Sequence, residues 1–190
     1  MRAALVSLVV VALHSLAAAQ QTVAGLRIPY PSSFSPVPAK ATAWKNGLPI
    51  EVQAKLSAFD VFEAPPDNDF REVRVLRIRY VAGTPFSLDG AADGAVRSVL
   101  ALPGIEQPNH RVTPTNVSGR PARRTSLEAK RFGGRLGAEF LQIYDPALKT
   151  TWQVQLIFHS STSLNPFADK SLDAQRAAAK KLLQGVLVIE

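Results

Sequence analysis

Residues 151–159 read TWQVQLIFH, and this stretch decides the fold. Its large apolar side chains recur at every second position, and two glutamines stand between them. A period of two is the pattern of a β-strand that buries one face and leaves the other more polar. Residues 136–144 form a second strand-like stretch, and DPALK at 145–149 reads as the turn between the two. We therefore expect these strands to pair antiparallel.

Strands come in runs along the rest of the chain, while helices are predicted at only two places. Asn46-Gly47 reads as a tight turn, because both residues tolerate positive φ angles, and an alternating strand follows over 50–58. Further strands are predicted over 70–81, 115–130 and 186–190, and helices over 87–104 and 169–184. This order favours an α+β domain with a mainly antiparallel central sheet and helices on its faces.

The apolar patterns of one strand and of the last helix add detail to this prediction. The apolar positions of the strand at 70–81 change parity between Val75 and Leu76, which indicates either a bulge or burial on both faces at that point. The last helix carries a core-facing stripe at helical spacing. The residues of that stripe are Leu172, Ala179, Leu182 and Leu183.

The N-terminus predicts export. Arg2 is followed by a largely apolar run and by small residues up to Ala19, which is the pattern of a secretory signal peptide over residues 1–19. Residues 20–190 are then the mature chain, long enough for one domain without a second. The 190 residues include no cysteine, so we expect neither disulfides nor a cysteine-linked lipid anchor. The expected location is periplasmic or secreted, in a bacterium.

Basic residues outnumber acidic ones, 22 to 15, and they concentrate in residues 118–135. The candidate partner-binding residues of this stretch are Arg120, Arg123, Arg124, Lys130, Arg131 and Arg135. Two interpretations stay open: a surface for an anionic partner, or a solvated hairpin whose charges pair locally. On one strand, Arg120 and Arg124 share a face and Arg123 points to the other. The partner we expect is a protein or an anionic envelope component, because only Phe132 could stack a nucleic-acid base here.

Catalytic motifs are scarce in this sequence. His110 lies in a predicted Pro-rich loop, and His159 lies at the end of a predicted strand. The sequence has no third ligand at a spacing typical of metal-binding motifs. The glycines of GGRLG, residues 133–137, precede a strand rather than the helix that a phosphate-binding loop requires, so they read as a hairpin turn. We expect no cofactor. The alternative is a hydrolase or metal-dependent enzyme whose residues converge only in the fold.

The order of these elements resembles a known family. The stretches GLRIPYPSSF, LALPG, VSGRPARR, TTWQVQLIF and AQRAAAKKLLQGVLVI, taken in this order, are similar to the fold shared by PsbP and the Ran-binding Mog proteins. The resemblance implies a central antiparallel sheet covered by helices on both faces, and a non-catalytic accessory or binding role. The sequence thus predicts an exported binding module that engages an anionic partner through its Arg-rich strand and turn.

Overall fold

The computed structural model describes residues 20–29, 34–63, 72–80, 83, 85–160 and 168–189. The predicted signal peptide at 1–19 lies outside them. The elements are β1 (Gln20–Val23), β2 (Leu26–Pro29), β3 (Ser35–Pro36), α1 (Pro38–Asn46), α2 (Ile50–Gln53), β4 (Leu56–Glu63), β5 (Glu72–Arg79), α3 (Leu88–Leu100), β6 (Ile105–Val117), β7 (Arg120–Arg131), β8 (Gly134–Asp145), β9 (Thr150–Ser160), α4 (Ala168–Gln184) and β10 (Leu187–Val188).

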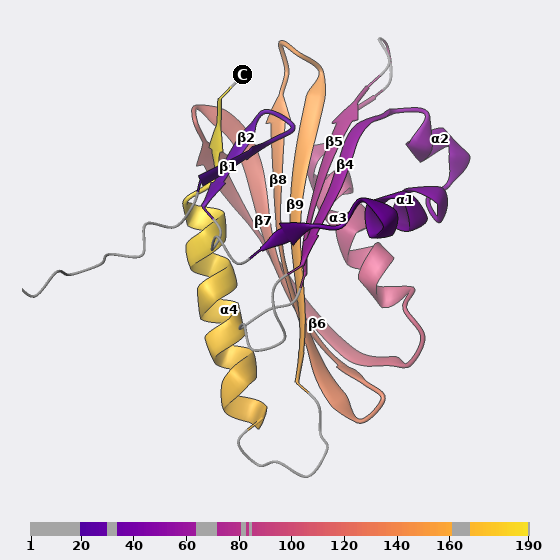
Figure 1. The fold of residues 1–190 in the computed structure, drawn as a ribbon, viewed down its shortest axis with the longest axis vertical. Coiled ribbons are helices and arrows are strands. Elements are labelled where there is room, and N and C mark those ends of the chain that lie inside the picture. Colours follow the sequence, from indigo (N-terminus) through magenta and orange to yellow (C-terminus); the bar gives the residue numbers. More distant parts are fainter. Residues whose placement is uncertain are drawn as a thin grey trace, which may run out of the picture.

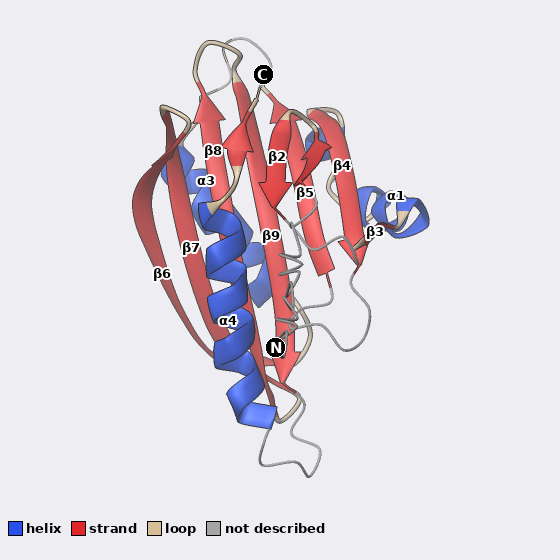
Figure 2. Cartoon of the chain, turned by 60° about the vertical axis from the view of Figure 1, so that its left-hand side comes forward, coloured by secondary structure: helices blue, strands red, loops and turns tan. Residues whose placement is uncertain are grey.

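The main sheet of the described residues has seven strands in the order β3-β4-β5-β9-β8-β7-β6, and every neighbouring pair is antiparallel. A small sheet of β1, β2 and β10 lies on one face beside α4, and α3 lies on the other face (Figures 1 and 2). The predicted α+β class, with an antiparallel sheet and helices packed on it, is confirmed. The predicted pairing of β8 with β9 is confirmed as well.

The alternation of β9 produces two separate cores. Trp152, Val154, Leu156 and Phe158 face α4 and pack with its apolar stripe, as predicted, while Ile157 faces α3. The Trp152 indole also donates a hydrogen bond of 2.7 Å to the carbonyl of Ala24, which ties the small sheet to the large one. In β5, Val75 and Leu76 are both buried and the register with β9 is continuous, so the parity change reflects burial on both faces.

Two sequence predictions are wrong. Residues 46–53 form no hairpin turn and strand: α1 ends at Asn46, Gly47 has a right-handed φ of −80°, and Ile50–Gln53 is the short helix α2. The helix α1 was missed although Pro38 stands at its first turn, where proline's fixed φ favours helix initiation. Its residues include none that is buried, so the apolar periodicity that marks most helices is missing.

The second error concerns 105–130. The supposed loop around His110 belongs to the 13-residue strand β6, and the predicted strand at 115–130 is interrupted by a two-residue turn at Ser118-Gly119. Asn116 stabilises that turn, because its side-chain carbonyl accepts a hydrogen bond of 2.9 Å from the Gly119 amide. Strand β6 lies at the edge of the sheet and is exposed on both faces for most of its length, so it shows no apolar alternation.

Candidate functional site: a cationic groove between β6 and α4

The arginines of β7 divide between the two faces of the sheet. Arg120 faces α4's side and donates to Asp145 at 2.6 Å, whereas Arg123 faces α3 and donates to Asp89 at 2.5 Å. A hydrogen bond from the Leu148 amide, with that from Arg120, holds the pKa of Asp145 below its ordinary value. The hydrogen bond from Arg123 likewise lowers the pKa of Asp89. These two arginines are thus engaged within the molecule.

Arg135 and Arg176 converge on one carboxylate. Glu128, on β7, accepts hydrogen bonds from Arg135 of β8, at 3.0 Å from its Nε, and from Arg176 of α4 at 2.8 Å. Burial alone raises the pKa of Glu128, but the hydrogen bonds from the two arginines outweigh it and hold that pKa below its ordinary value. The cluster attaches α4 to the sheet and pairs Glu128, which among the described residues is the acid that lines the groove introduced below.

Glu139 lies beneath this cluster and is fully buried. Its Oε2 accepts a hydrogen bond of 2.8 Å from the Ser126 hydroxyl, and Arg124 and Arg176 approach its carboxylate to 3.7 and 3.8 Å. Burial raises the pKa of Glu139, although Ser126 and the neighbouring cations, including Lys180, oppose that rise. The Glu139 Oε1 and the Arg124 Nε and Nη2 are buried and find no hydrogen-bond partner among the residues that the structure describes. This floor therefore retains unused hydrogen-bonding capacity.

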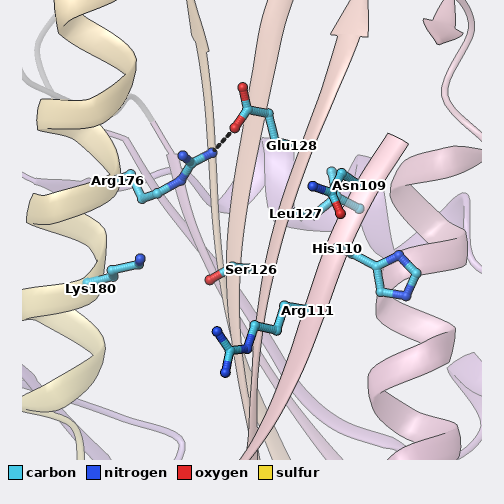
Figure 3. A pocket seen from close by; sticks show the side chains of 8 residues that line it. All are labelled: Asn109, His110, Arg111, Ser126, Leu127, Glu128, Arg176 and Lys180. Carbon is cyan, nitrogen blue, oxygen red and sulfur yellow. Dashed lines mark hydrogen bonds and ion pairs between the residues drawn. The ribbon is translucent and has the colours of Figure 1, made fainter. Parts of the chain in front are cut away.

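A groove of about 180 Å³ opens above that floor, between the edge strand and α4 (Figure 3). Its lining residues are Asn109, His110, Arg111, Ser126, Leu127, Glu128, Arg176 and Lys180. Register pairs Arg111 of β6 with Ser126 of β7, so both side chains lie on the face that carries α4. Figure 3 shows the charged ends of Arg111 and Lys180 directed from opposite walls toward the Ser126 hydroxyl, while the His110 ring points away.

Arg111 and Lys180 make no hydrogen bond or ion pair with the residues that the structure describes. They are the unpaired cations of the groove, and the sequence prediction contained neither. The spacing of Arg176 and Lys180, four residues apart on one helix face, could have pointed to a shared cationic surface. Nothing local identifies Arg111, because its role depends on the position of a strand that the sequence pattern hides.

The six residues predicted to bind a partner do not form one cluster in the structure. Arg124 and Arg135 lie beside the groove, Arg120 belongs to the same face, and Arg123 belongs to the opposite one. Lys130 and Arg131 lie at the β7–β8 turn. The arginines of β5, which are Arg74, Arg77 and Arg79, lie apart from this set, because β9 and β8 separate β5 from β7. A common binding role for the six stays a prediction.

The two histidines occupy distant strands. His110 lies on β6 and His159 on β9, with two strands between them, which places their backbones about 14 Å apart at the usual strand spacing. Within the described ranges no group of three or more His, Cys, Asp or Glu residues is placed to hold a metal ion. None of the helices in those ranges has the length and apolar composition of a membrane span.

No protein-family model and no curated protein matches this chain. Solved structures match it in fold. A point mutant of Mog1 matches with a TM-score of 0.55 and 12% identity, covering 87% of this chain and 92% of that one. The Ran-binding protein Mog1p of Saccharomyces cerevisiae matches with a TM-score of 0.54 and 9% identity. That match covers 87% of this chain and 91% of Mog1p. LpqN of Mycobacterium tuberculosis, described as involved in cell envelope biogenesis, matches with a TM-score of 0.48 and 12% identity. That match covers 87% of this chain and 83% of LpqN.

The chain therefore has a Mog1-like α+β fold over most of its length, and the resemblance predicted from the sequence is confirmed as a resemblance of fold. At identities of 9% and 12%, the two Mog1 matches establish the architecture alone, and function must be argued from the residues of the groove.

Proposed function

We propose that this protein is a non-catalytic binding module of the bacterial cell envelope, whose groove between β6 and α4 holds an acidic segment of a partner protein. The observation that carries the proposal is the pair of unpaired cations, Arg111 and Lys180, directed from opposite walls toward Ser126. The envelope location rests on the signal-like sequence of residues 1–19.

The groove has the electrostatics of an anion site. Glu128 is the acid among the described residues that line it, and Glu128 is already paired with Arg135 and Arg176, so it does not offset the charges of Arg111 and Lys180. An arginine offers a planar fork of donors that matches a carboxylate, and Ser126 adds a hydroxyl between the two cations. A carboxylate that enters here gains charge-assisted hydrogen bonds without displacing any internal ion pair.

The shape favours an extended partner. Residues Asn109, Thr113 and Thr115 lie on the same face of β6 as Arg111, because side chains alternate along a strand, and all three are exposed. They form a polar row beside α4 that can hydrogen-bond a segment running along the strand. The free edge of β6 is less suited, because Pro108, Pro114 and the irregular register between Glu106 and Asn109 oppose the addition of another strand.

Each exposed cation contributes at most about 1 kcal/mol, and the contribution falls with salt. Two of them together correspond to about a tenfold change in affinity, since 1.4 kcal/mol is a factor of ten. We therefore expect a moderate, salt-sensitive interaction that depends on several contacts along the groove rather than on one residue.

Isothermal titration calorimetry with a short poly-glutamate peptide tests the proposal, with poly-glutamine as the uncharged control ligand. The double variant Arg111→Gln/Lys180→Gln should bind poly-glutamate about tenfold more weakly than the wild type. The matched control is Arg97→Gln/Lys181→Gln, which removes the same charge from exposed positions that do not line the groove. Equal loss in both double variants, or no binding by the wild type, would refute the groove as the site.

A further inference from the structure

Three hairpins of this chain share one turn geometry, and one of them carries an unexpected residue. The two-residue turns Ala24-Gly25, Ser118-Gly119 and Phe132-Gly133 each place both residues at positive φ, which is the signature of a type I′ turn. The first position of such turns favours Asn, Asp or Gly, because a bulky side chain is strained there. Alanine and serine are small substitutes, whereas the Phe132 side chain is large and aromatic.

Packing does not explain this phenylalanine. Its side chain is 72% exposed, which places it among the most exposed large apolar residues described. One side of the ring lies against the backbone of Gly104, where an added Cβ would come within 2.4 Å of it. Arg131 fixes the base of the turn, because its Nε donates to the carbonyl of Pro103 at 3.1 Å. The ring is thus held in place on one side and presented outward on the other.

Cations flank the ring. Arg131 has its guanidinium 5.2 Å from the ring centroid, and Lys130, one residue earlier, is exposed and makes no hydrogen bond or ion pair with the described residues. Both lie within two residues of Phe132, or about 7 Å along the chain. An acid, Glu106, lies opposite Lys130 in the register with β6. The turn's own residues, Lys130 to Gly133, include two cations and no acid, so the turn is positively charged.

We propose that the β7–β8 turn is a membrane-contact site, at which Phe132 enters the headgroup region of an anionic bilayer while Lys130 and Arg131 bind lipid phosphates. The turn projects at one end of the molecule (Figure 1), where Lys130 and Phe132 are exposed and Arg131 is half-buried. An exposed apolar residue with adjacent basic residues is the combination that interfacial membrane binding uses. This site is separate from the groove, which stays open to a partner when the turn contacts lipid.

Co-sedimentation with vesicles of phosphatidylglycerol and phosphatidylcholine tests this inference, with pure phosphatidylcholine vesicles for comparison. The wild type should bind the anionic vesicles and lose binding with salt. Phe132→Ser, which copies the turn at Ser118, should bind about tenfold more weakly. The matched control Ile50→Ser removes a residue that is 75% exposed on α2, far from the turn, and should bind as the wild type does.

The charges have their own test. Lys130→Gln/Arg131→Gln should weaken binding about twentyfold, and Arg97→Gln/Lys181→Gln should change it much less. A thermal melt of each variant confirms that it is folded, which is expected since these side chains lie at exposed or half-buried positions. The inference is overturned if the wild type ignores anionic vesicles, or if Phe132→Ser binds them as well as the wild type. The second outcome would assign the exposed ring to another use, such as a pocket in a protein.

Discussion

Replacing Glu128 by glutamine should loosen the attachment of α4 to the sheet and remove one source of acid sensitivity. The Glu128 carboxylate accepts hydrogen bonds from Arg135 on β8 and from Arg176 on α4, so it connects two strands and a helix. Glutamine keeps the volume of the side chain but loses the charge. The two ion pairs are then reduced to neutral contacts.

The magnitude follows from exposure. The Glu128 side chain is 35% exposed, so solvent screens each pair and neither contributes more than a fraction of 1 kcal/mol. We expect a loss of about 1 kcal/mol of unfolding free energy at neutral pH for the two together. The pKa of Glu128 lies below its ordinary value of 4.5 in the folded protein. A lowered pKa stabilises the folded state above that ordinary value and loses this effect as pH falls through the folded pKa.

Urea unfolding measured at intervals of about half a pH unit from about pH 3 to pH 7 gives both the loss of unfolding free energy and its dependence on pH. Glu128→Gln should be less stable than the wild type at neutral pH, and the difference should shrink toward the acid end. Glu139→Gln is the matched comparison on the neighbouring strand. Burial raises the pKa of Glu139, so the wild type loses stability as pH rises through that value, and this variant should gain relative to it. A constant difference between Glu128→Gln and the wild type at every pH would refute the reasoning.

Three further predictions concern glycine positions, the helix α1 and export. Gly137→Ala should cost about 2 kcal/mol in urea unfolding, because its Cβ would come within 2.1 Å of the buried Phe158 ring, whereas Gly94→Ala, with nothing within 4 Å, should gain up to about 1 kcal/mol. Trp44→Ala removes the ring that lies 3.6 Å from the Arg74 guanidinium, so limited proteolysis should cut near α1 faster while the melting midpoint changes little. Mass spectrometry of a periplasmic extract should find a chain that begins at Gln20; a chain retaining residues 1–19 would contradict export.

The interior strands could be predicted from the sequence because their side chains pack against other apolar side chains on a defined face. In β9 the alternation of Trp152, Val154 and Leu156 with glutamines reflects a core on the α4 face, and the stripe of α4 completes that core. Strand β5 was found for the same reason. Where one face of a strand or helix is buried, apolar residues recur at regular intervals, and this periodicity identifies the element in the sequence.

The edges of the fold could not be predicted in the same way. Strand β6 faces solvent on both sides and carries Pro108 and Pro114, which an edge strand tolerates but which read as a loop in the sequence. The groove was missed for a related reason. Arg111 and Lys180 are 69 positions apart in the chain, and only the sheet order and the packing of α4 on β8 and β9 bring them to one groove.

The central claim is that acidic segments bind between β6 and α4, and backbone amide NMR tests it most directly. Poly-glutamate titrated into ¹⁵N-labelled protein should shift the amides of Arg111, Ser126 and Lys180 along one saturating curve. Arg123, which faces α3 and is paired with Asp89, should stay unperturbed. Shifts spread over basic residues of both faces, without saturation, would contradict a groove-specific site and reduce the interaction to the general attraction of a basic protein for a polyanion.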